Sequence, residues 1–295
     1  MKKTIFLIFL SFLILNVPKS NAMDYSTYCS TITPKTTFGG NVASVSGFNS
    51  ISRNIIENKI QKALKKETNS KFKVKVDNFR GTNILNGEFK NLSAVSDLVQ
   101  YGGIYFSDVK INSLCDYNKV SYTDKKLLFD ENLVLKYSTK ITQQNLDKTL
   151  SESGYKKLIE KFNQDKVASS LFKITNAKVL IKNDRLELNY EFTPFPKTNL
   201  FDFAKNIIKP VKISMGANLK VVDNKIELCD FDLNNIKSSY YPIVNAINSF
   251  NLLKWSMPLS NDVKGKIQVE NVKIENSTIN IDGVVLVPKN NSART

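Results

Sequence analysis

The sequence predicts an α+β fold in which an amphipathic helix is followed by an antiparallel sheet built from successive hairpins. Residues 50–67 place apolar side chains at the i, i+3 and i+4 spacing of one helix face. From residue 72 onward the apolar period changes to two, which is typical of strands with one buried and one solvated face. Residues 178–192, 219–233 and 272–287 each show strand, polar turn and strand, which predicts hairpins.

The helix predicted over residues 50–67 has one apolar stripe and one polar face. Ser50 is suited to cap its first turn, and Asn69 is suited to close it. The polar face is rich in Lys, which favours contact with solvent. The apolar stripe consists of Ile51, Ile55, Ile56, Ile60, Ala63 and Leu64.

The remaining elements follow from the same two periods. Further helices are predicted over residues 145–163 and 239–253, and a short amphipathic turn over 201–208 is ended by Pro210. Strands are predicted over residues 72–76, 84–92, 104–111, 127–129 and 133–141.

The N-terminal residues have the order of features found in a secretory signal peptide. Lys2 and Lys3 precede an apolar stretch over residues 5–17, and Ser20 and Ala22 supply small residues at a cleavage site. That stretch is about 13 residues long, against the roughly 20 that span a bilayer. An uncleaved N-terminal anchor is the alternative. We therefore expect a periplasmic or secreted protein with three parts: a signal peptide over 1–22, a linker or disordered arm over 23–48, and a folded α+β domain over 49–290.

Charge and cysteine content bear on partners and compartment. Lys and Arg number 42 against 27 Asp and Glu, a net charge of +15 that becomes +12 without residues 1–22. This favours acidic partners such as lipid head groups, polysaccharides or nucleic acid. The chain has three cysteines, Cys29, Cys115 and Cys229. Export permits a disulfide, for which Cys115 and Cys229 are the pair inside the expected domain; three unpaired thiols are the alternative.

Several kinds of catalytic chemistry are missing. His is absent from the sequence, which excludes His-activated nucleophiles, imidazole metal sites and His acid–base catalysis. No Gly-rich phosphate loop is present. Asp230 and Asp232 alternate on a predicted strand and could bind Ca²⁺ or cleave a glycoside, but such a pair is more often a solvated strand face. We therefore expect no enzyme activity, no metal and no cofactor.

The densest basic cluster extends from Lys65 to Arg80 and has Phe72 and Phe79 between its charges. Aromatic platforms among basic residues bind single-stranded nucleic acid, but Phe72 lies on the apolar side of an alternating strand. The sequence therefore predicts no nucleic-acid partner. The cluster is then either a solvated face of the protein or a surface that contacts an anionic membrane.

The apolar faces of the predicted elements allow two arrangements. They can close as an ordinary core, or the sheet can curl around a long helix and leave an apolar groove.

Several segments, taken in order, resemble the LmeA-like phospholipid-binding family of exported bacterial proteins. They are the alternating segment Tyr101-Gly102-Gly103 to Ile111, the helix start from Thr139 through Asn145-Leu146 to Leu150, and the strand–turn–strand segment from Asn183 to Leu188. The resemblance spans roughly residues 50–290. Asn145 stands where the family usually has an acidic residue. The resemblance implies a tubular, BPI-like architecture in which a long amphipathic helix is wrapped by a curved antiparallel sheet, and it implies binding of phospholipid acyl chains.

The leading hypothesis is therefore an exported protein that holds a phospholipid or other acyl lipid in an apolar groove beside an anionic membrane, for envelope lipid maintenance or transfer. The alternatives are a non-enzymatic envelope module that binds anionic cell-wall polymer, and a hydrolase that uses Asp230 and Asp232. The sequence does not indicate an oligomeric state. Candidate lipid-facing residues are Ile51, Ile55, Ile56, Ile60 and Leu64 along the helix, with Phe201, Phe203, Ile207 and Ile208 at a mouth.

Overall fold

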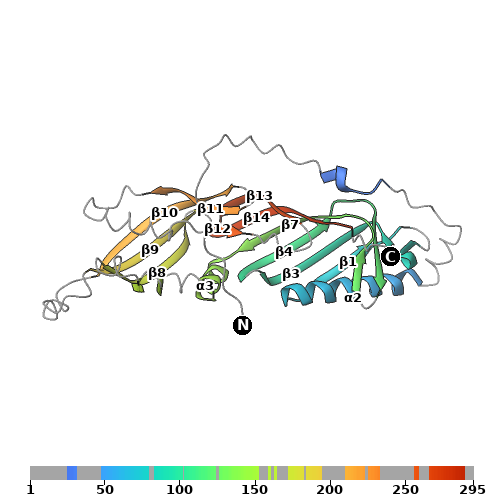
Figure 1. Cartoon of the computed structure of the whole chain (residues 1–295), viewed down its shortest axis with the longest axis horizontal. Helices are drawn as coiled ribbons and strands as arrows, with labels where there is room; N and C mark the ends of the chain where they lie inside the picture. The colour runs from blue at the N-terminus through green and yellow to red at the C-terminus, as the bar shows by residue number, and fades with distance from the viewer. Residues whose placement is uncertain are drawn as a thin grey trace.

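The computed structural model is an elongated molecule built mainly from antiparallel strands (Figure 1). It describes residues 25–31, 48–79, 83–101, 103–123, 126–152, 159–160, 163–164, 172–182, 184–194, 210–222, 225–232, 256–258 and 266–289. The helices delimited in these ranges are η1 (Tyr25–Tyr28), α2 (Phe48–Thr68), η2 (Asn83–Asn86) and α3 (Gln143–Glu152), of which η1 and η2 are 3-10 helices.

The strands form two large sheets and one small sheet. Their bounds are β1 (Lys73–Asp77), β2 (Glu88–Phe89), β3 (Asn91–Tyr101), β4 (Ile104–Ser113), β5 (Asn118–Thr123), β6 (Lys126–Phe129), β7 (Leu133–Ile141), β8 (Phe172–Lys182), β9 (Arg185–Pro194), β10 (Val211–Val222), β11 (Lys225–Asp232), β12 (Ser256–Pro258), β13 (Lys266–Glu275) and β14 (Thr278–Val287). The six-stranded sheet has the order β1-β3-β4-β7-β14-β13, the five-stranded sheet β12-β11-β10-β9-β8, and the small sheet β2-β5-β6.

The two large sheets share one hydrophobic core. They lie side by side along the long axis of the molecule, with β10 in contact with β13 (Figure 1). Phe192 and Met215 of the five-stranded sheet, and Ile141 and Ile281 of the six-stranded sheet, are at most 1% exposed and belong to the same cluster. We call the face of each large sheet that contributes to this cluster its inner face.

The expected α+β fold with a long helix wrapped by a curved sheet is wrong. The described residues are predominantly strand, and neither α2 nor the shorter α3 is wrapped by a sheet. On one side α2 contacts β1 and β3 and buries Ile56 and Ile60, whereas Ile55 is 54% exposed. The apolar stripe of α2 covers only one of its faces, so the polar face of the helix meets solvent instead of a second layer of strands.

Most of the local elements were predicted correctly. The helix expected over residues 50–67 is α2, and all three expected hairpins are confirmed as β8–β9, β10–β11 and β13–β14. The strand expected over 84–92 is wrong in its first part, because η2 occupies that part and the chain turns at Gly87. Gly87 has a φ of 76°, and a Cβ there would lie 1.8 Å from the carbonyl oxygen of Val120, so only glycine fits.

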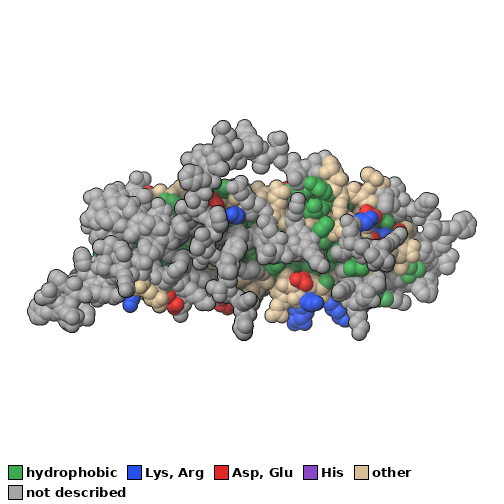
Figure 2. Space-filling model, viewed as in Figure 1, with side chains coloured by type: hydrophobic (Ala, Val, Ile, Leu, Met, Phe, Trp, Pro, Cys, Tyr) green, Lys and Arg blue, Asp and Glu red, His purple; other side chains and the backbone are tan. Residues whose placement is uncertain are grey.

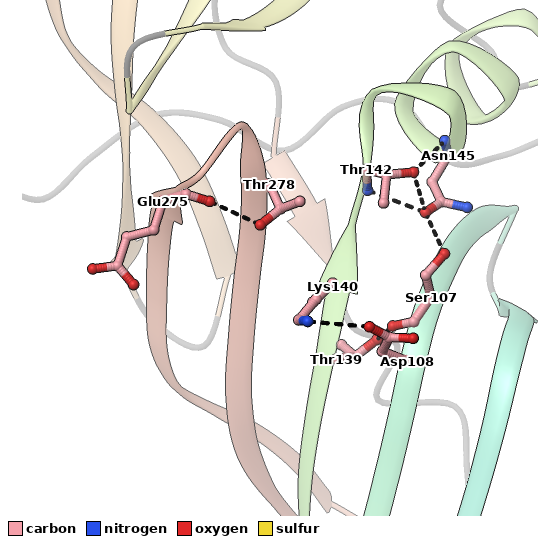
Figure 3. Close-up of polar contacts among 8 residues, drawn as sticks. All are labelled: Ser107, Asp108, Thr139, Lys140, Thr142, Asn145, Glu275 and Thr278. Carbon is pink, nitrogen blue, oxygen red and sulfur yellow. Dashed lines mark hydrogen bonds and ion pairs between the residues drawn. The ribbon is translucent and has the colours of Figure 1, made fainter.

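Of the other predicted helices, the one expected over 145–163 begins earlier, because α3 starts at Gln143. The side chains of Thr142 and Asn145 explain this start (Figure 3). The Asn145 backbone N–H donates to Thr142 Oγ1 at 3.3 Å, and the Thr142 backbone N–H donates to Asn145 Oδ1 at 3.1 Å. This is a capping box with Asn in place of the usual Glu. The segments expected as a helix over 239–253 and as a turn over 201–208 lie outside the described residues.

A β-bulge in β4 decides which side chains face inward. Asp108 has a φ of 52°, and the register between β4 and β7 shifts by one residue between Ser107 and Lys110. Thr139 Oγ1 donates to the Ser107 carbonyl at 3.1 Å, and Lys140 Nζ lies 3.1 Å from Asp108 Oδ2 (Figure 3). A bulge inserts one residue and re-aims the side chains that follow.

The N-terminal arm includes a packed segment. Within residues 23–48, expected to be a linker or disordered arm, η1 lies against the outer face of the six-stranded sheet, where Tyr25 and Tyr28 pack beside Val134 and Val284. Cys29 forms a disulfide with Cys115, so the pairing expected between Cys115 and Cys229 is wrong, and Cys229 is a free thiol. Nothing in the local sequence pattern indicates that the arm reaches the domain, so the pattern does not point to Cys29 as the partner.

Two side-chain amides protect the edge of the five-stranded sheet at β8. Gln143 accepts from the Ile181 N–H at 2.8 Å and donates to the Val179 carbonyl at 2.9 Å. Asn163 makes the same pair of bonds with the N–H and carbonyl of Ile174, both at 2.8 Å. Each amide takes the place of a residue in a neighbouring strand. The backbone N–H and carbonyl groups that it bonds are therefore not free to pair with a strand of another chain.

Candidate functional site

An apolar cavity of about 130 Å³ lies on the inner face of the six-stranded sheet. It sits over the central strands, beyond the part of the sheet that α2 covers, and none of the described residues that line it is charged. The bulge at Asp108 allows Phe106 and Val109, three positions apart on β4, to face it together. Its lining residues are Val99, Tyr101, Phe106, Val109, Ile111, Tyr137, Thr139, Ile267, Ile281 and Val285.

Two polar side chains in the lining are bonded to the backbone. The Tyr137 hydroxyl donates to the carbonyl oxygen of Gln268 at 3.3 Å. The Thr139 hydroxyl donates to the carbonyl oxygen of Ser107 at 3.1 Å. Because these donors are used within the sheet, Tyr137 offers the cavity its ring and Thr139 its methyl group. Their presence in the lining therefore does not make the cavity polar.

Gly283 makes the position of Tyr137 possible. The two residues face one another across β7 and β14, and a Cβ at Gly283 would lie 2.6 Å from the Tyr137 hydroxyl oxygen and 2.0 Å from the Gln268 carbonyl oxygen. The aromatic ring therefore lies across the glycine and reaches the next strand. Burial, and then the carboxylates of Asp282 and Glu270, hold the pKa of Tyr137 far above its ordinary value. The hydroxyl therefore stays protonated and remains a donor.

The size of the cavity limits what it can hold. An apolar cavity of about 150 Å³ in a protein core stays dry and binds benzene. A cavity of about 130 Å³ therefore takes a group of a few carbon atoms, such as part of an alkyl chain. The cavity is open on one side, so the rest of such a chain can extend out of it.

A second cavity, of about 340 Å³, lies on the outer face of the five-stranded sheet and is polar. Its charged residues are already paired: Arg185 lies 3.6 Å from Asp232, and Lys182 lies 3.5 Å from Glu187. Hydrogen bonds from Asn189, together with Lys182, lower the pKa of Glu187 despite its partial burial. The cavity therefore presents compensated charges.

The two aspartates singled out in the sequence, Asp230 and Asp232, lie at this end of β11. Asp230 has a φ of 50°, which interrupts the alternation of the strand, and its carboxylate accepts from Asn218 at 3.5 Å. Asp232 is the partner of Arg185. Among the described residues, no group of three or more acidic residues and cysteines is placed to hold a metal ion.

Among the lipid-facing residues predicted from the sequence, those that the structure describes do not line the apolar cavity. Ile56 and Ile60 are buried between α2 and the sheet, Leu64 packs against the same core, and Ile55 points to solvent. The side chain of Ile51 lies outside the described residues. So do the four residues proposed as a mouth, Phe201, Phe203, Ile207 and Ile208.

The residues that form the cavity come instead from the strands. One sequence signal could have indicated them: the segment from Tyr101 to Ile111, which carries the family resemblance, supplies four lining residues. Periodicity could not separate an inner face that stays partly open from one that is covered, because both have the same apolar pattern.

Comparison with protein families, with curated proteins and with solved structures found no match to this chain. Of the helices in the described part of the chain, none combines the length and the apolar character that a membrane span requires.

Proposed function

We propose that this protein is exported and binds an acyl lipid, part of whose chain occupies the apolar cavity of the six-stranded sheet. The observation that carries the proposal is a cavity whose described lining residues carry no charge, and in which the Tyr137 and Thr139 hydroxyls are hydrogen-bonded to the backbone. Alkyl groups gain about 0.8 kcal/mol for each methylene removed from water. Such a site recognises length and shape of an apolar chain and leaves a polar head group outside.

Export is supported by two independent features. The first 22 residues have the pattern of a signal peptide, and Cys29 is bonded to Cys115. Disulfides persist in the periplasm and outside the cell, whereas cytosolic thiols are kept reduced. The same compartment brings the protein into reach of envelope lipids, for whose maintenance or transfer we propose that it acts.

The test is an acyl-binding titration with a fluorescent fatty acid, cis-parinaric acid, after mass spectrometry of an organic extract of the purified protein. Val285→Phe should weaken binding by about tenfold or more, because the new ring displaces at least two methylenes of the ligand, each worth about 0.8 kcal/mol. Val285 lines the cavity from β14 and is only partly buried, so the larger side chain can be accommodated.

The matched control is Val287→Phe, the same substitution two residues along β14 and outside the cavity lining. It should change the affinity by less than about twofold. Equal losses in the two variants would place the acyl chain elsewhere on the protein. Absence of both a co-purifying lipid and uptake of the fatty acid by the wild-type protein would refute acyl binding itself.

A further inference from the structure

The lysines of α2 form an exposed basic surface at one end of the molecule (Figure 1). Figure 1 places α2 along one long edge, and Figure 2 shows Lys and Arg side chains along that edge. We define the lysine surface as Lys62, Lys65 and Lys66 of α2, all of which are exposed. Lys73 and Lys75 of β1 are exposed too, but they alternate with Val74 and Val76, which pack with α2, and therefore point away from the helix. Lysines are common on edge strands such as β1, where they prevent pairing with another chain. That role does not explain the three on α2.

The lysine surface has little compensation by acidic groups. In the described part of the chain, none of these three lysines makes an ion pair. Glu67 is the single acidic residue in the last two turns of the helix, so residues 62–67 carry a net charge of +2. Glu57 on the same helix is engaged with Arg53 and with the backbone N–H of Val76. The surface therefore attracts anions over its whole length.

Exposed apolar side chains accompany these charges. Ile55 is 54% exposed and precedes Lys62 and Lys66 by seven and eleven residues, which places the three on one stripe of α2. Leu85, also 54% exposed, lies on η2, which packs against α2. A stripe that combines lysines with a large apolar side chain suits the boundary between lipid head groups and acyl chains. A charged polymer offers no apolar layer for Ile55.

We propose that the lysine surface docks on a bilayer that contains anionic phospholipid, with the side chain of Ile55 inserted among the head groups. This proposal goes beyond the acyl site and does not depend on it. A variant with the cavity filled, Val285→Phe, should therefore bind vesicles as the wild-type protein does. The two proposals can then fail separately.

The experiment is flotation of the full chain with vesicles of phosphatidylcholine alone, or with about a third of phosphatidylglycerol, at low and physiological salt. The wild-type protein should float with the anionic vesicles only, and more so at low salt. Changing Lys62, Lys65 and Lys66 together to Gln should weaken binding by about a hundredfold, because each lysine near an anionic surface contributes roughly fivefold. Ile55→Ser should weaken it further at physiological salt.

The matched control changes Lys136, Lys178 and Lys225 to Gln, which removes the same charge from exposed sites on β7, β8 and β11. It should weaken binding by less than about threefold. Urea unfolding of each variant shows whether the fold is intact. Equal losses in the two triple variants, or no binding by the wild-type protein, would overturn the proposal. So would binding to isolated anionic cell-wall polymer that equals vesicle binding and is unchanged by Ile55→Ser.

Discussion

Replacement of Cys29 by Ser should lower the free energy of unfolding by about 2–5 kcal/mol. The Cys29–Cys115 disulfide closes a loop with a sequence separation of 86 residues, for which the chain-entropy model gives about 4–5 kcal/mol at 25 °C. It also holds η1 on the outer face of the six-stranded sheet, where Tyr25 and Tyr28 pack. The measurement is urea unfolding followed by circular dichroism.

Cys229→Ser is the matched control, because Cys229 is a free, partly exposed thiol. It should change the free energy of unfolding by less than about 0.5 kcal/mol, as surface substitutions usually do. A reducing agent should destabilise the wild-type protein and leave the Cys29→Ser variant unchanged. If Cys229→Ser were the more damaging change, the disulfide would join different residues from those described here.

The second large effect is expected from Gly283→Ala, which should cost about 3 kcal/mol, the upper end of the usual range for overpacking. The added Cβ would lie 2.0 Å from the Gln268 carbonyl oxygen, so that β13 and β14 must separate. It would also displace the Tyr137 ring, which is a wall of the cavity, and we expect weaker acyl binding as a result. Urea unfolding and the fatty-acid titration measure the two effects.

Gly216→Ala tests what decides the loss of stability: the short contact that the new Cβ makes, or whether the contacted atoms can move. A Cβ at Gly216 would lie 2.8 Å from Cζ of Arg185, but that side chain is flexible and 38% exposed. It can move aside, so the loss should stay below about 1 kcal/mol. Similar losses in the two glycine variants would show that Tyr137 and Gln268 can adjust as easily as Arg185.

The resemblance to the LmeA-like family stays a prediction, and the fold inferred from it does not hold. Its implied architecture required α2 to be enclosed, and the exposure of Ile55 and of the lysines shows that one side of α2 meets solvent. The acyl-binding proposal now rests on different residues, from β3, β4, β7, β13 and β14. The expected site on α2 was a stripe of isoleucines, whose described members either fill the core or face solvent.

By itself the sequence determined the features that depend on neighbouring residues. The period of the apolar residues placed α2 and the hairpins, since a helix or strand buries one face whatever it packs against. Composition alone excluded His chemistry and set the positive charge.

Only the tertiary structure decided the features that join distant residues. The partner of Cys115 depends on where the N-terminal arm lies. The cavity depends on the bulge at Asp108, on Gly283 opposite Tyr137, and on how far α2 covers the sheet. Each is a matter of distance between segments far apart in the chain, and a local pattern contains no measure of that distance.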